Sequence, residues 1–246
     1  MNILPWRKSK SDLYVSGNGQ LVIRDTDYAG ESVRVLYVND TRESATYNAP
    51  NRRNDLIFEY TKGLNLVLEK APHIKDTLML GGAGFSYPKY YISRFPDKRM
   101  DVVEVDAKMV DLAMKYFYLD ELFAQFDLHH NDRLTIIIAD GADYLAGCNK
   151  RYDAIFNDAY VGNIPDKGLL SEQGVRNIKR ALKNDGVYAL NLITALSGPK
   201  SMRGIMAEAI LRNHFRSVTV LPCTTGRTPE QTQNCVIVAT DVELNL

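Results

Sequence analysis

The sequence predicts an α/β fold, with a doubly wound, mostly parallel sheet of seven strands and a small N-terminal β-hairpin extension. Two observations predict the sheet. From residue 76 onward, short apolar runs alternate with amphipathic helical patterns, which is typical of strand–helix–strand units. The runs are apolar on both faces, so their strands are expected to lie between two layers of helices. A third observation predicts the extension, because the pattern before residue 48 is strand and turn.

The extension is expected to span residues 1–48, and a larger domain residues 49–246. The β-branched runs LVIRD (21–25) and SVRVLYV (32–38) have alternating faces, and the turn signal SGNGQ precedes them. The larger domain is expected to begin with a helix. Its apolar residues recur at helical spacing from Ile57 to Leu68, and the pattern stops at Pro72.

Seven strands are expected in the larger domain, with helical patterns at 107–117, 169–185 and 201–215 among the segments between them. The last two strands are joined by a loop without a helix, so we expect them to form an antiparallel pair at the edge of the sheet. The predicted strands are TLMLGG (77–82), MDVVEVD (100–106), LTIIIAD (134–140), YDAIFND (152–158), GVYALNLI (186–193), SVTVLP (217–222) and NCVIVAT (234–240).

Composition excludes several classes of protein. Thirty basic residues balance thirty acidic residues, so no overall charge attracts nucleic acid or an anionic membrane. No apolar run is long enough to cross a membrane, and the first residues lack the apolar core of a signal peptide. The three cysteines lie far apart, and no histidine has a partner at metal-ligand spacing. We therefore expect a soluble, cytoplasmic protein without a metal site.

The loop GGAGFS (81–86) follows the first strand of the sheet and precedes a helix. Ligands of doubly wound sheets bind beyond the carboxyl ends of the strands, where small residues let a ligand approach the backbone. No Gly-Lys-Ser/Thr follows, so the loop is not a triphosphate-binding loop. Taken alone, the loop is weak evidence for a ligand, and a structural turn is the alternative.

Carboxylates follow three further strands. Glu104 is suited to accept hydrogen bonds from ribose hydroxyls, and Asp140, beside Gly141 and Ala142, from an adenine amine. Asp158 ends the fourth strand. An acidic rim without a phosphate-binding lysine favours a cationic nucleoside without phosphates, such as an adenosyl sulfonium compound, over a dinucleotide. We expect the loop, through Gly81, Gly82 and Gly84, to cradle the sulfur end of that ligand.

These segments, in this order, resemble the spermidine synthases (polyamine aminopropyltransferases), and most of all a divergent bacterial branch of that family. The resemblance covers residues 33–240 and implies a Rossmann-like, class I methyltransferase fold. Its anchor points are LYVNDTRESA, FEYTKGL, LMLGGAGFS, DVVEVD, ADGADYL, YDAIFNDAYVGNIP and LKNDGVYALNL.

The resemblance implies roles for individual residues. Glu104 and Asp140 would bind the ribose and the adenine, and Asp158 would accept the proton of the attacking amine. Tyr60, or else Phe58, lies near the tyrosine that lines the family's substrate cleft. Tyr160 follows the strand-end pair and is expected either to line the acceptor pocket or to pack as structure.

The chain departs from the family's pattern at two acidic positions. Gly84 stands where the family has an aspartate that grips the aminopropyl ammonium, and Ala159, Tyr160 and Val161 follow Asp158 in place of a segment with a second aspartate. Glu43 occupies the place of a glutamine near the donor's tail. A glutamate there would attract the ammonium of decarboxylated S-adenosylmethionine and repel the carboxylate of S-adenosylmethionine. Alternatively, Glu43 is a solvated residue paired with Arg42.

Three functions are consistent with these residues. The first is aminopropyl transfer from decarboxylated S-adenosylmethionine to a small-molecule amine. The second is methyl transfer from S-adenosylmethionine to a small acceptor, and the third is nucleoside binding by a protein without activity. The resemblance also implies a homodimer or homotetramer.

The remaining candidates are expected to be structural. Tyr87, Tyr90, Tyr91 and Phe95 recur at helical spacing, which is typical of core or interface packing. His129 and His130 are expected in a solvated loop. Cys223 and Cys235 could approach each other across the last strand pair, but buried free thiols are the expectation.

Overall fold

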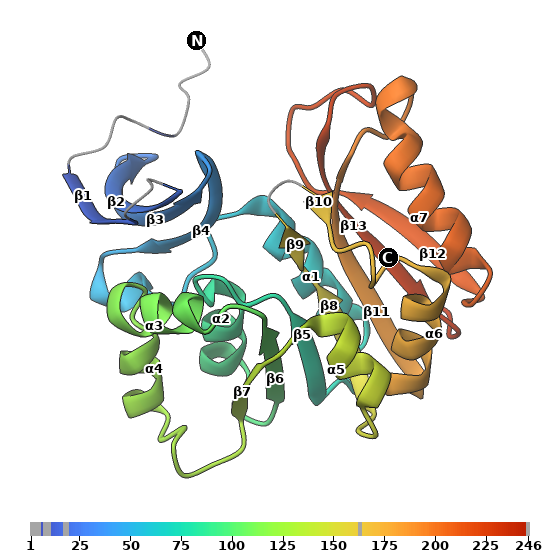
Figure 1. Ribbon diagram of the computed structural model, residues 1–246, viewed down its shortest axis with the longest axis horizontal. Helices are drawn as coiled ribbons and strands as arrows, with labels where there is room; N and C mark the ends of the chain where they lie inside the picture. The colour runs from blue at the N-terminus through green and yellow to red at the C-terminus, as the bar shows by residue number, and fades with distance from the viewer. Residues whose placement is uncertain (1–5, 7–10, 17–19, 162–163, 245–246) are drawn as a thin grey trace.

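The computed structural model describes residue 6 and residues 11–16, 20–161 and 164–244. The N-terminal part is a four-stranded antiparallel sheet whose strands follow one another in chain order (Figure 1). The strands are β1 (Ser11–Val15), β2 (Leu21–Tyr28), β3 (Glu31–Val38) and β4 (Thr41–Tyr47). The extension is therefore antiparallel, as expected, and larger than a single hairpin.

Two tight turns build this small sheet. Ala29 and Gly30 between β2 and β3, and Asn39 and Asp40 between β3 and β4, all have positive φ angles. Two successive residues with positive φ match the right-handed twist of a hairpin, so each pair of strands can follow directly. Asn, Asp and Gly adopt this conformation at low cost.

The larger part contains the predicted seven-stranded sheet, in the order β12-β13-β11-β8-β5-β6-β7. Strand β13 is antiparallel to both its neighbours, and the remaining pairs are parallel. The predicted antiparallel pair does lie at one edge, with β12 outermost. The strands are β5 (Asp76–Leu80), β6 (Arg99–Glu104), β7 (Leu134–Ile138), β8 (Tyr152–Asn157), β11 (Leu182–Thr194), β12 (Ser217–Pro222) and β13 (Gln233–Thr240).

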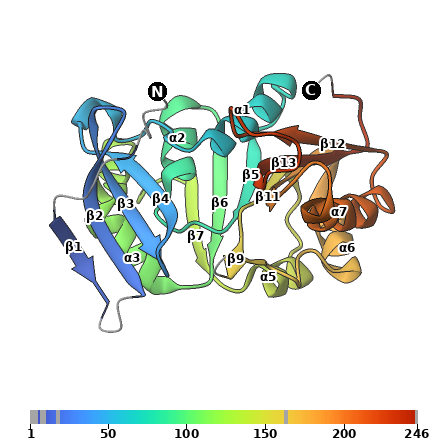
Figure 2. The ribbon, with the colours of Figure 1, turned by 90° about the horizontal axis from the view of Figure 1, so that it is seen from above.

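Helices cover both faces of this sheet. Figure 2 shows α1 and α2 on one side and α5, α6 and α7 on the other. The helices are α1 (Glu59–Lys70), α2 (Ser86–Arg94), α3 (Ala107–Tyr116), α4 (Leu119–Gln125), α5 (Gly141–Gly147), α6 (Glu172–Ala181) and α7 (Met202–Arg212), with 3-10 turns at Pro50–Arg52 and Pro199–Ser201. Two short strands, β9 (Tyr160–Val161) and β10 (Ile164–Pro165), pair beyond the end of β8.

Each face of the large sheet has its own apolar core. The core under α1 and α2 includes Tyr87 and Tyr91, with Tyr90 and Phe95 packed against it, so the packing predicted for these rings is confirmed. Leu145, Ile178 and Leu211 belong to the core on the other face. Cys223 and Cys235 are free thiols. None of the helices in the described part of the chain is long and apolar enough to cross a membrane.

The N-terminal sheet packs against the larger part through a third cluster. Ile23 of β2 and Leu36 of β3 are buried against Leu112 of α3 and Phe117. This contact places the edge of β4 beside the glycine loop. The boundary at residue 48 stays a prediction.

Candidate active site

The predicted site residues meet at the point where the strand order reverses. From β5 the chain continues to β6 and β7 on one side, and β8 and β11 lie on the other. Such a reversal opens a crevice beyond the carboxyl ends of the strands. One hollow of about 210 Å³ lies there, and its lining includes Gly81, Glu104, Asp140 and Asp158. The structure thus brings together all four strand ends, as expected.

Gly81 is needed by the geometry of this crevice. Its φ is +88°, and a Cβ atom on it would lie 2.6 Å from the carbonyl oxygen of Asp158. A side chain at this position would therefore force the ends of β5 and β8 apart.

Glu104 fixes the glycine loop. Its Oε2 accepts hydrogen bonds from the backbone N–H groups of Gly82 at 2.8 Å and Ala83 at 2.9 Å, and its Oε1 accepts from Asp106 N–H at 3.0 Å. The side chain lines the hollow although the residue is only 6% exposed. Its carboxylate is therefore held rigidly at the edge where the ribose is expected.

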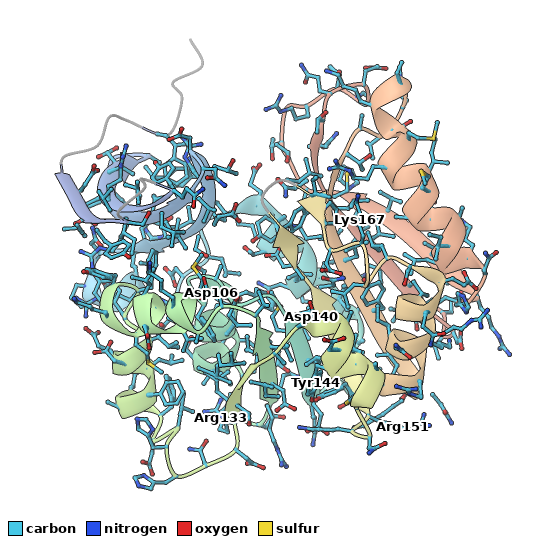
Figure 3. All side chains as sticks on the ribbon, in the orientation of Figure 1. Asp106, Arg133, Asp140, Tyr144, Arg151 and Lys167 are labelled. Carbon is cyan, nitrogen blue, oxygen red and sulfur yellow. The ribbon has the colours of Figure 1, made fainter. Side chains whose placement is uncertain are left out.

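Asp140 is the N-cap residue directly before α5, and Tyr144 lies in the first turn of the helix (Figure 3). Its Oδ1 accepts from the N–H groups of Ala142 and Asp143, so the carboxylate caps the helix. Gly141 lines the hollow beside it, but Ala142 does not. The helix cap fixes the orientation of the Asp140 carboxylate at the rim.

The sequence analysis places Gly84 among the ligand-binding residues, but in the structure it lies away from the crevice. It lines neither this hollow nor the larger cleft next to it. Its N–H donates to Ser44 Oγ at 2.9 Å, and a Cβ atom on it would lie 2.6 Å from the Cβ of Ser44. Gly84 is therefore a packing residue that allows β4 to approach the loop.

A larger cleft of about 1270 Å³ adjoins the hollow. It lies between the N-terminal sheet, the start of α1 and the loop that joins β12 to β13. The two spaces share Glu43, Gly81, Ala83, Asp158 and Tyr160. A ligand in the hollow and a second ligand in the cleft would therefore meet beside Asp158.

The carboxylate of Asp158 is held at this junction by two neutral donors. Tyr60 OH donates to its Oδ2 at 2.7 Å, and Asn191 Nδ2 donates to its Oδ1 at 2.7 Å. Burial raises the pKa of Asp158 to about 6, although both hydrogen bonds favour the charged form and lower it. A carboxyl group with a pKa near neutrality is suited to accept a proton and release it again.

Glu43 lies in a β-bulge. Leu36 of β3 pairs with Ser44 and Tyr37 pairs with Arg42, so Glu43 between them has no partner on β3. An extra residue of this kind bends the strand and redirects its side chain. The side chain of Glu43 lines both the hollow and the cleft.

Burial, followed by the charge of Asp158, raises the pKa of Glu43 to about 7. The alternative pairing with Arg42 is wrong, because the Arg42 guanidinium lies over the Trp6 ring, 4.4 Å from its centroid. The carboxylate of Glu43 has no hydrogen bond or ion pair with any residue that the structure describes. It is therefore available to a ligand.

Tyrosines form the remaining walls near Asp158. Tyr60 lines the cleft and stacks on Phe58, with ring centroids 6.0 Å apart, so both candidates for the cleft aromatic residue lie there. The hydroxyl of Tyr160 donates to the carbonyl of Asn191 at 3.0 Å and accepts from Ile193 N–H at 3.1 Å. Tyr160 thus presents its ring to the site.

Several lining residues were not identified from the sequence. Asn191 is the one polar residue in the apolar run VYALNLI, which was a usable signal. Val105, 68% exposed, and Met109 line the hollow and give it an apolar wall. Trp6 and Arg227 line the cleft, but they are far from the other site residues in sequence.

Within the described ranges, no group of His, Cys, Asp or Glu is arranged to hold a metal ion.

The strand order, the glycine turn and the acidic strand ends define a Rossmann-like protein of the class I methyltransferase type. Within this class the chain belongs to the spermine/spermidine synthase family, because residues 59–243 match the Spermine/spermidine synthase domain model.

Curated relatives include the polyamine aminopropyltransferase of Streptococcus uberis, 35% identical over 117 residues that make up 47% of this chain and 39% of that protein. The polyamine aminopropyltransferase of Moorella thermoacetica is 26% identical over 77% of this chain and 62% of its own length. The mouse eEF1A lysine and N-terminal methyltransferase is 32% identical over 47% of this chain and 17% of that protein. The chain thus spans less than two thirds of the length of each.

Solved structures share the fold. A spermidine synthase in complex with the transition-state analogue AdoDATO has a TM-score of 0.71 at 19% identity, covering 96% of this chain and 75% of that one. Human methyltransferase-like protein 13 in complex with SAH has a TM-score of 0.59 at 23% identity, covering 75% of this chain and 82% of that one.

Proposed function

We propose that this protein transfers an aminopropyl group from decarboxylated S-adenosylmethionine to a small-molecule amine. The observation that carries the proposal is the pair of carboxylates, Glu43 and Asp158, at the junction of the hollow and the cleft. The proposed reaction joins two cations at this place, since the donor ends in an ammonium and the acceptor arrives as one. A carboxylate for each of them matches that chemistry. Membership of the spermine/spermidine synthase family supports the same reaction.

In the proposed complex the adenosyl part of the donor occupies the hollow. Glu104 accepts from the ribose hydroxyls and Asp140 from the adenine amine, while Val105 and Met109 contact the purine. Gly81 and Gly82 allow the sulfonium to approach the backbone, and the aminopropyl tail extends toward Glu43. Glu43 replaces the carboxylate that the family has at the position of Gly84.

The transfer is an in-line displacement at carbon. The amine nitrogen of the acceptor attacks the methylene carbon bound to sulfur, the carbon–sulfur bond breaks, and its electron pair remains on the neutral thioether. The acceptor must first lose a proton, because alkylammonium groups are almost fully charged near neutral pH. Asp158 accepts that proton, while Tyr60 and Asn191 hold its carboxylate toward the cleft. Alignment of the two substrates supplies most of the rate.

The proposal is tested by calorimetry with both forms of the donor. The wild-type protein is expected to bind the decarboxylated form more tightly than S-adenosylmethionine, because Glu43 attracts an ammonium and repels a carboxylate. Glu43→Gln should reduce the ratio of the two affinities about tenfold or more. The matched control is Glu69→Gln, which alters an exposed residue of α1. Equal or reversed affinities in the wild-type protein would contradict aminopropyl transfer.

Methyl transfer from S-adenosylmethionine is the second candidate. It is favoured by the similarity to the eEF1A lysine and N-terminal methyltransferases and by the shared fold. The same calorimetry decides between the two, since a methyltransferase would prefer the donor with the carboxylate.

A cytoplasmic location and a homodimer or homotetramer stay predictions, as does the absence of nucleic-acid and membrane partners.

A further inference from the structure

The strand that carries Glu43 is attached to the glycine loop by a row of hydrogen bonds. Three successive residues of β4 each contact a residue at or near the start of α2. Gly84 N–H donates to Ser44 Oγ at 2.9 Å, Ser86 Oγ donates to the carbonyl of Ala45 at 2.8 Å, and Lys89 Nζ donates to Thr46 Oγ1 at 3.1 Å. This row begins directly after Glu43.

Lys89 is the buried end of the row. The residue is 1% exposed, and its ammonium also donates to the carbonyls of Arg53 at 2.8 Å and Phe117 at 2.5 Å. Thr46 Oγ1 donates to the same Arg53 carbonyl at 2.8 Å. Burial lowers the pKa of Lys89 to about 7, which the charge of Glu121 opposes and that of Arg53 reinforces. A buried cation of this kind is stable only where each of its protons has an acceptor.

The bulge makes Glu43 dependent on these contacts. A regular strand residue is fixed by its partner on the neighbouring strand, but Glu43 has no such partner on β3. The residues that follow it, 44–46, pair with β3 and are also bonded to α2 and to the loop before it, so these bonds fix the chain next to Glu43 on a second side. Without the Lys89 ammonium, Thr46 would keep its pairing with Arg34 and its bond to the Arg53 carbonyl, but it would lose its link to α2. That link helps to set how closely β4, and with it Glu43, lies against the glycine loop.

We infer that Lys89, through its bond to Thr46, is a positioning residue for Glu43 and thereby determines which donor the protein selects. The inference rests on the proposed function, because it assigns Glu43 to the donor's tail. Lys89 lines neither the hollow nor the cleft, so it does not touch the ligand.

Lys98 provides a matched control. It too is a buried lysine, 7% exposed, and its ammonium donates to the backbone carbonyls of Pro72 and Ile74. Burial also lowers its pKa. These contacts lie at the start of β5, at the other end of the large sheet from Asp158. A methionine at either position keeps most of the length of the unbranched side chain and removes the charge.

The experiment compares the wild-type protein with Lys89→Met and Lys98→Met. Calorimetry gives the ratio of the affinities for decarboxylated S-adenosylmethionine and S-adenosylmethionine, with methylthioadenosine, which has no charged tail, as the reference. Both variants are expected to unfold more easily. Only Lys89→Met should lower the ratio, by about tenfold or more, since a displacement of about 1 Å can cost that much or more. Its affinity for methylthioadenosine should stay within a few-fold of the wild-type value.

Hydrogen exchange provides a second measurement that does not depend on the donor. Lys89→Met should increase exchange in residues 41–47 and 81–86, whereas Lys98→Met should increase it near residues 72–80. Ser44→Ala removes only the acceptor of the Gly84 N–H. It is expected to fold and to lower the same ratio by a smaller factor.

The outcomes are distinguishable. A wild-type protein without any donor preference would overturn the proposed function, and the selectivity role of Lys89 with it. A wild-type preference that Lys89→Met and Ser44→Ala leave intact would overturn the inference alone. A ratio that falls equally in Lys89→Met and Lys98→Met would also overturn it, since it would indicate general loosening.

Discussion

The hydroxyl of Tyr60 donates a hydrogen bond to Oδ2 of Asp158 at 2.7 Å, joining the first turn of α1 to the end of β8. Asn191 of β11 binds the other carboxylate oxygen, and Asn234 of β13 donates in turn to Asn191 Oδ1 at 3.1 Å. Three segments that are distant from one another in sequence, α1, β11 and β13, therefore hold one carboxylate. Its position is set by the fold and not by the short segment in which it lies.

Replacing Asp158 by asparagine is expected to remove the proton acceptor and leave the fold intact. The introduced amide can still accept from Asn191 through its oxygen and donate to Tyr60 through its nitrogen. Turnover should fall about 10²-fold or more, while donor affinity should change only a few-fold. Steady-state kinetics and calorimetry measure the two quantities. Asp185→Asn, at an exposed position, is the control. Turnover that persists in Asp158→Asn would show that another group accepts the proton.

Tyr60→Phe is expected to shift the pH dependence of turnover. In the wild-type protein, kcat/KM should rise with pH as Asp158, with a pKa of about 6, loses its proton. Because the Tyr60 bond stabilises the charged form of Asp158, its loss should move the rise in kcat/KM to higher pH by roughly one unit. Tyr90→Phe, which alters a partly buried tyrosine of α2 packed against the core, should leave the profile in place. An unshifted profile in Tyr60→Phe would mean that the rise in kcat/KM follows the titration of a group other than Asp158.

The carboxylates at the junction should make stability depend on pH. Burial raises the pKa of Asp158 from 3.8 to about 6 and that of Glu43 from 4.5 to about 7, so the folded protein binds protons that the unfolded chain has released. Stability is therefore lost as the pH rises from about 4 to about 7. Glu43→Gln should unfold at a higher denaturant concentration than the wild-type protein at pH 8, with a smaller difference at pH 4. Glu69→Gln should show no such trend. A constant difference across this range would contradict the pKa shift.

Gly81→Ala is expected to disturb both the fold and the site. The residue has a φ of +88°, and the new Cβ would lie 2.6 Å from the Asp158 carbonyl oxygen. Strain at such a position costs about 1–3 kcal/mol, and the collision adds to it. Denaturant unfolding should therefore show a loss of about 2 kcal/mol or more, and turnover should fall because Asp158 moves. Gly147→Ala, where nothing lies within 4 Å of the new Cβ, should be nearly neutral. Equal effects of the two would exclude a special role for Gly81.

The sequence predicts the large sheet and the acidic crevice well. The apolar runs have sharp ends, so Glu104, Asp140 and Asp158 can be placed at strand ends, and parallel neighbours bring those ends together. The prediction fails where position depends on tertiary packing. In the sequence, Gly84 looks like a loop residue that faces the ligand. In the structure its N–H is bonded to Ser44, forty residues earlier, and it packs against β4 instead.

The strand pairing of the N-terminal sheet is also difficult to predict from the sequence. The pair Asn39–Asp40 is a turn signal in the sequence, since positive φ is easy for Asn and Asp, and it separates β3 from β4. Ala29 gives no such signal, because positive φ is costly for alanine. The bulge at Glu43 has no such local signal, because it depends on how β3 and β4 pair and on what α2 contacts. Asn191 was visible as a lone polar residue in an apolar strand, but its partner could not be known without the sheet order.

In the proposed complex, the irregular pairing at Glu43 makes donor preference sensitive to the number of residues in β4. Deleting a single residue in β4 would restore regular pairing with β3 and turn the next side chain toward the opposite surface. The nucleoside crevice, built from other strands, would be untouched. Under the proposed function, descendants of this chain could thus exchange one donor for another through an insertion or deletion, without any substitution among the residues proposed to hold the adenosine.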